Sequence, residues 1–76
     1  MILPTKYVSL EKSLLGAGSV VLRILVEPMT ITGIWEQVKH APEIGAYGRF
    51  VLTLDFLYAI GSIDMEEGLV VRKEKS

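Results

Sequence analysis

The chain has 76 residues, of which 50% are apolar and 22% are charged, and it contains no cysteine. A single domain this short buries only about 60% of the surface that its unfolded chain exposes, so the apolar content is high for a protein that works alone. The absence of cysteine excludes a disulfide scaffold and thiolate zinc sites. Eight Lys and Arg against nine Asp and Glu give a net charge of −1, without the basic excess typical of nucleic-acid-binding proteins.

The apolar runs of the sequence are too short to cross a bilayer. Arg23 is the only charged residue in 13–26, and Asp55 is the only one in 50–63. Both runs fall short of the roughly 20 apolar residues of a transmembrane helix. The N-terminus lacks the basic stretch, apolar core and cleavage site of a signal peptide. We therefore expect a soluble, cytoplasmic protein.

The first residues predict an extended N-terminal arm over 1–8. Pro4 has no N–H group to donate, and it biases Leu3 towards an extended conformation. Ser9 is then a candidate cap for the first helix.

Periodic apolar positions predict that the first helix continues to about Glu27, where Pro28 ends it. Two glycines, Gly16 and Gly18, interrupt its first half, and each costs about 1 kcal/mol relative to Ala in a helix interior. They indicate either a break near Gly16 or a close approach by another backbone.

A second helix is expected after a short extended link at 29–31. Thr30 is its candidate N-cap, and the helix should end before Pro42. Spacings of four and three residues predict one inward face, made by Ile31, Trp35 and Val38.

A third helix is predicted over 47–60, after a turn at 41–46. Gly61 follows it, at the position where the left-handed backbone conformation commonly ends a helix. Its expected inward face is Phe50, Leu54 and Leu57, flanked by Val51 and Tyr58. Leu52, Phe56 and Ala59 make much of the opposite side apolar as well.

The C-terminal part predicts a two-stranded hairpin. Residues 63–65 and 69–71 are the expected strands, joined by a three-residue turn, Glu66-Glu67-Gly68. A polar tail is expected over 72–76. The predicted fold is mostly α with a small β-hairpin, a single winged helix-turn-helix-like domain over residues 1–76, and the alternative is a plain three-helix bundle with a frayed tail.

The first and third helices are apolar on every side, which a domain with one small core cannot cover. Exposed apolar patches of this kind mark protein interfaces. We therefore expect an obligate protein partner, or self-association. The candidate partner-binding residues are Leu3, Lys6, Tyr7, Val20, Ile24, Leu52, Phe56 and Ala59.

Several short segments carry a resemblance to a known family. They are Ile2-Leu3-Pro4-Thr5-Lys6-Tyr7, Ser13-Leu14-Leu15-Gly16, Pro28-Met29-Thr30 leading to Trp35-Glu36, and the block from Arg49 to Gly61. Over nearly its whole length the chain resembles the small middle components of bacterial ABC-three-component conflict systems, specifically the sixth middle-component family. The chain departs from that pattern at Gly33, which leaves a capping box incomplete, and at Gly45 to Gly48, where a polar cap is usual.

The resemblance implies a winged-helix-like adaptor subunit that bridges an SMC/Rad50-like ABC ATPase and another subunit in a defence complex against phages or plasmids. A homodimeric winged-helix DNA-binding transcriptional regulator is the alternative. Direct DNA binding by the isolated chain is not expected, because Asp55 on the third helix would repel phosphate.

Neither catalysis nor cofactor binding is indicated by the polar residues. His40 is the only histidine, so neither a metal site nor an activated serine nucleophile is expected. Asp64, Glu66 and Glu67 suit a solvated hairpin better than a catalytic carboxylate pair. We expect a non-catalytic protein with no cofactor, no metal and no membrane association.

Overall fold

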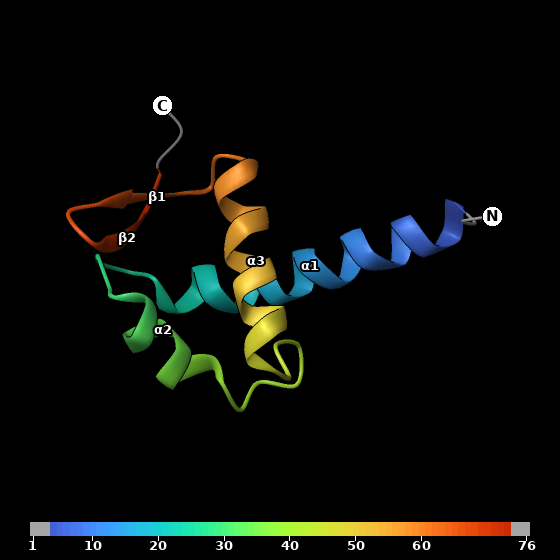
Figure 1. Cartoon of the computed structure of the whole chain (residues 1–76), viewed down its shortest axis with the longest axis horizontal. Helices are drawn as coiled ribbons and strands as arrows, with labels where there is room; N and C mark the ends of the chain where they lie inside the picture. The colour runs from blue at the N-terminus through green and yellow to red at the C-terminus, as the bar shows by residue number, and fades with distance from the viewer. Residues whose placement is uncertain (1–3, 74–76) are drawn as a thin grey trace.

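The protein is mostly helical, with a two-stranded hairpin at its C-terminal end. The structure, a computed structural model, describes the backbone of residues 4–73 and the side chains of residues 12–73. Its elements in chain order are α1 (Pro4–Ile24), α2 (Ile31–Val38), α3 (Tyr47–Ala59), β1 (Ile63–Glu66) and β2 (Leu69–Arg72). The predicted winged-helix-like order is confirmed, and the alternative of a three-helix bundle with an unstructured C-terminal tail is wrong (Figure 1).

The extended arm predicted over residues 1–8 is wrong for the part that the structure describes, because α1 begins at Pro4. The first N–H groups of a helix have no helical acceptor, so a proline fits the first helical position without losing a hydrogen bond. Ser9, the expected cap, therefore lies inside α1. Residues 1–3 lie outside the described residues.

Helix α1 runs through Gly16 and Gly18 without a break, so the predicted break near Gly16 is wrong. The predicted close approach is found only at Gly18, and it is made by a side chain and not by another backbone. Gly18 is buried where α1 meets Leu57 of α3. The helix ends at Ile24, three residues before the predicted Glu27. Pro28 disfavours helical backbone at the residue before it, and the chain then leads into an extended pairing at Met29.

Helix α2 begins as predicted, because the Thr30 side chain accepts a hydrogen bond from the Gly33 backbone N–H at 3.0 Å. Its inward face differs from the prediction. Ile34 and Val38 are fully buried, while Ile31 is exposed at the edge of the hairpin. Val38 is inward as predicted, and Trp35 is half-buried and packs against the core, so only Ile31 departs from the predicted face. Ile31 is the first residue of α2, two residues after Met29 pairs with the hairpin.

Helix α3 places Phe50, Leu54 and Leu57 inward as predicted, together with a buried Thr53 that the prediction missed. The Thr53 hydroxyl donates to the Arg49 carbonyl at 2.7 Å, which satisfies this polar group inside the core. Ala46, the N-cap residue, makes no side-chain capping bond. Ile60 and Gly61 close the helix, with Gly61 at φ 79° as predicted.

The hairpin differs from the prediction in its turn, which has two residues instead of three. Register pairs Glu66 with Leu69 and Ile63 with Arg72, which leaves Glu67 and Gly68 as the turn. Their φ values of 53° and 79° are both positive, as a type I′ turn requires. Arg72, expected in the polar tail, is the last residue of β2, and residues 74–76 lie outside the described residues.

One core joins all of these elements. Its largest fully buried side chains are Val21, Leu25, Ile34, Val38, Ile44, Phe50, Thr53 and Val70. The N-terminal half of α1 extends away from the other elements (Figure 1), and the described chain measures 42 × 31 × 18 Å. The hairpin is held against the helical part at Met29, whose backbone pairs with Val70.

Candidate functional site

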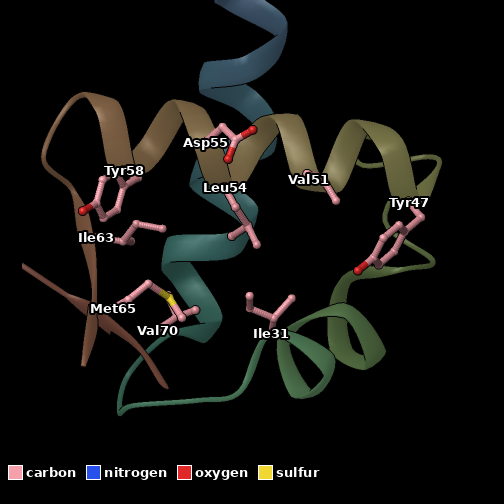
Figure 2. Close-up of a pocket in the computed structure, with 9 residues that line it drawn as sticks. All are labelled: Ile31, Tyr47, Val51, Leu54, Asp55, Tyr58, Ile63, Met65 and Val70. Carbon is pink, nitrogen blue, oxygen red and sulfur yellow. The ribbon is translucent and has the colours of Figure 1, made fainter. Parts of the chain in front are cut away.

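An apolar groove of about 360 Å³ lies between α3, the start of α2 and the hairpin (Figure 2). Val51 and Leu54 point from α3 toward Ile31 of α2 on the opposite wall. The hairpin closes one end of the groove. The lining residues are Ile31, Tyr47, Val51, Leu54, Asp55, Tyr58, Ile63, Met65 and Val70.

The groove has a buried floor and exposed apolar walls. Leu54, Ile63 and Val70 are buried and make the floor. Val51 remains 39% exposed, Met65 43% and Tyr58 57%, although all three side chains belong to the lining. Apolar walls left open to water above a packed floor are the surface that a bound partner would cover.

Four residues of α3 follow one face along the groove. Tyr47, Val51, Leu54 and Tyr58 are spaced by four, three and four residues, which is the spacing of the apolar stripe in a coiled coil. The stripe covers about 16 Å at 1.5 Å per residue. Its length matches about three turns of an approaching helix.

Aromatic packing holds the N-terminal end of this stripe in place. The Tyr47 ring meets the Trp35 ring edge-on, with centroids 5.1 Å apart and an interplanar angle of 89°. Phe50, fully buried, packs against both rings at centroid distances of 5.2 and 5.8 Å. Trp35 is thus a core anchor beneath the groove, and Tyr47 is a preformed part of its wall.

Among the side chains that the structure describes, Asp55 is the only charged one that lines the groove. Its side chain is exposed on α3. Within residues 12–73 the one ion pair joins Lys39 and Glu36, so no cation there lies within 4.0 Å of the Asp55 carboxylate. Arg49, also on α3, directs its Nε–H to the Glu43 carbonyl at 2.9 Å.

Part of the hairpin backbone beside the groove is already engaged in hydrogen bonds. On β2, the Val70 N–H donates to the Met29 carbonyl at 2.7 Å, and the Met29 N–H donates back at 3.1 Å. On β1, the Met65 N–H donates to Oδ1 of Asp64 at 2.8 Å. These contacts occupy edge groups that an added strand would need.

Comparison with known protein families decides the identity of the chain. Residues 3–74 match the model of a family described as ABC-three component (ABC-3C) system Middle Component 6. The chain belongs to this family. No curated protein and no solved structure matched the chain. The resemblance inferred from the sequence motifs is therefore confirmed, and the fold described above is that of this middle component.

In the structure of this middle component, the predicted partner-binding residues of α3 lie on a different side of the helix from the groove. Leu52 and Ala59 are exposed, and Phe56 is half-buried against the core. We call Leu52, Phe56 and Ala59 the outer stripe. Because their spacing is four and three residues, they share one face, which differs from the face that lines the groove.

The predicted partner-binding residues of α1 are less exposed than Leu52 and Ala59 of α3. Val20 and Ile24 are half-buried and pack against the core. The backbone at Lys6 and Tyr7 is helical, and their side chains lie outside the described part of the structure. Leu3 lies outside the described residues altogether.

The groove itself was missed by sequence reasoning. Val51 and Tyr58 were interpreted only as flanks of the inward face of the third helix, and Ile31 was expected on the inward face of the second helix. The four-three-four spacing from Tyr47 to Tyr58 is a signal that was available in the sequence. The opposing wall could not be predicted, since Ile31 and Met65 come from elements whose placement depends on the fold.

The polar residues considered at the outset have local roles. The Asp64 carboxylate accepts a hydrogen bond from the Met65 N–H in the hairpin, while Glu66 and Glu67 are exposed. Within the described residues, no three His, Cys, Asp or Glu side chains gather into a potential metal site. Over the same part of the middle component, no helix has the length and apolar character needed to cross a bilayer.

Proposed function

We propose that the chain is a non-catalytic adaptor subunit that binds an SMC/Rad50-like ABC ATPase and a second subunit and bridges them. The complex would act in the bacterial cytoplasm, in defence against phages or plasmids. Membership in a middle-component family supports a place in a multi-component system.

The observation that carries the bridging role is the pair of apolar surfaces on α3. The groove uses Tyr47, Val51 and Tyr58, and the outer stripe uses Leu52 and Ala59, on different faces of one helix. A bridge needs two surfaces that two partners can occupy at once. Burial of apolar area contributes about 25 cal/mol per Å² before the costs of association, so each surface is a source of binding free energy.

The experiment is a three-way co-purification. The ABC ATPase proposed as partner is tagged and expressed with the third component, with and without the middle component. We expect the ATPase and the third component to co-elute only when the middle component is present, with the mass of a ternary complex by light scattering. Direct association of the other two subunits without it, or a monodisperse monomer of this chain that binds neither, would contradict the adaptor role.

The winged-helix-like arrangement favours a second candidate, a homodimeric DNA-binding regulator. In that class the third helix enters the major groove with basic and amide side chains. Here the exposed groove face of α3 presents Tyr47, Val51, Asp55 and Tyr58. Salt-dependent retention of the isolated chain on duplex DNA is the measurement that would support this candidate over the adaptor.

A further inference from the structure

We infer that the groove binds an amphipathic α-helix of a partner subunit, and that a Lys or Arg of this helix pairs with Asp55. The inference rests on the proposed function, because it takes the helix from one of the two subunits that the adaptor binds. It adds the secondary structure, the apolar spacing and the charge of the segment that is recognised.

A helix fits the groove better than an extended strand. Strand addition gains its affinity from free backbone groups along a sheet edge. At this hairpin the Met65 N–H already donates to Asp64, and β2 already pairs with Met29 through Val70. The apolar side chains that line the groove are therefore the larger part of the recognition surface.

The spacing of the α3 stripe also selects a helix. Tyr47, Val51, Leu54 and Tyr58 present the repeat by which one helix packs along another. Ile31 and Met65 supply an opposing wall, so an entering helix would contact apolar side chains on both flanks (Figure 2). About 11 residues of partner helix, with apolar side chains at intervals of three and four, would cover the stripe.

The charge of the groove specifies the partner's polar residue. Asp55 adjoins the stripe at the position next to Leu54, where paired helices place their interhelical ion pairs. It is the single charge in the lining formed by residues 12–73, so the partner position opposite it should be a cation. A second copy of this chain, packed by the same groove, would offer no cation for Asp55 from the described lining residues.

The test begins with a photo-crosslinker in the intact complex. Tyr58, which is 57% exposed on the groove wall, is replaced by p-benzoylphenylalanine, and exposed Gln37 of α2 carries the same group as a control. After co-expression with the ATPase and the third component, we expect position 58 alone to crosslink to one of them. Mass spectrometry should map the site to a helical segment with the stated apolar spacing and a Lys or Arg.

Charge variants then test the ion pair. Each purified subunit, ATPase or third component, is the binding probe. We expect Asp55→Lys to weaken binding of the crosslinked subunit at least tenfold, and Asp55→Asn to weaken it less while reducing its salt dependence. The matched control Glu43→Lys, on an exposed turn outside the groove, should change binding less than twofold. Reversal of the mapped Lys or Arg to Glu should restore binding to the Asp55→Lys chain.

These experiments distinguish a failure of this inference from a failure of the proposed function. If the wild-type chain binds a subunit while Asp55→Lys binds equally well and position 58 gives no crosslink to it, the inference is wrong and the adaptor role stands. A crosslink from position 58 to a second copy of this chain, or to an extended segment, also overturns the inference. If the wild-type chain binds neither subunit, the proposed function fails together with it.

Discussion

Gly18 of α1 lies directly against Leu57 of α3, so closely that a Cβ atom at Gly18 would be 2.9 Å from the Leu57 Cδ2. Leu57 is itself buried, with 2% of its surface exposed, so it has little room to move away. Gly16, one half-turn earlier, has no atom within 4 Å of its Cβ position. The two glycines of α1 therefore have different roles, and only Gly18 is needed for the crossing of the two helices.

This difference predicts opposite effects of alanine at the two positions. Gly16→Ala should raise the free energy of unfolding by about 1 kcal/mol, because Ala is the better helix former and nothing blocks its methyl group. Gly18→Ala should lower it by about 1 kcal/mol, since overpacking outweighs the helix gain. Urea unfolding followed by circular dichroism measures both. Equal stabilisation by the two variants would contradict the close crossing.

The N-cap of α2 gives a second prediction. Thr30→Ala removes the acceptor of the Gly33 N–H and should lower the free energy of unfolding by about 1 kcal/mol. Thr30→Ser keeps a hydroxyl in the same place and serves as the control, with an expected change below about 0.5 kcal/mol. The same unfolding measurement applies. An unchanged free energy of unfolding in Thr30→Ala would show that the cap does not contribute to stability.

The hairpin turn gives a third prediction. Glu67 has a φ of 53°, a conformation that Asn and Gly adopt more readily than Glu. Glu67→Asn should therefore raise the free energy of unfolding by roughly 0.5 kcal/mol, and Gly68→Ala should lower it by about 1 kcal/mol. Hydrogen exchange of the hairpin amides reports the change locally. Slower exchange in Gly68→Ala would contradict the two-residue turn.

The pairing of Met29 with Val70 gives a fourth prediction. Met29→Pro removes the N–H that donates to the Val70 carbonyl and should lower the free energy of unfolding by about 1–3 kcal/mol. Met29→Leu keeps both backbone bonds and a similar side-chain volume, so it is the matched control. Amide exchange in β2 should become faster only in the proline variant. Equal exchange in both would mean that the hairpin does not depend on this pairing.

The two surfaces of α3 give a fifth prediction. Val51→Lys alters the groove, and Leu52→Lys alters the outer stripe one residue away, with the same change of charge. Both side chains are exposed, so each variant should keep its free energy of unfolding within about 0.5 kcal/mol. In co-purification each should lose one subunit and retain the other. Loss of the same subunit by both variants would mean that α3 does not offer two separate sites.

Much of the secondary structure was predictable because it depends on local chemistry. The start of α2 follows from the hydroxyl of Thr30, and the end of α3 follows from the freedom of Gly61 to adopt a positive φ. Errors arose where two local rules competed. Pro4 can begin a helix as readily as it can precede one, and a turn containing Glu67 and Gly68 can have two or three residues.

The candidate site was less predictable than the fold. The excess of apolar side chains on α3 indicated a bound partner, and Leu52 and Ala59 are indeed exposed. The groove depends on Ile31 and Met65 lying opposite Val51, although these residues are 20 and 14 positions away along the chain. Periodicity within one helix contains no information about which side chains of other elements face it.

The sequence by itself determined the family, the order of the elements and the apolar excess, because motif identity, capping and hydrophobic spacing are properties of neighbouring residues. Only the tertiary structure decided which apolar residues remain in contact with water. That choice follows from the crossing of α1 and α3 at Gly18 and from the pairing of Met29 with Val70, which together place the hairpin beside α3 and leave a groove between them.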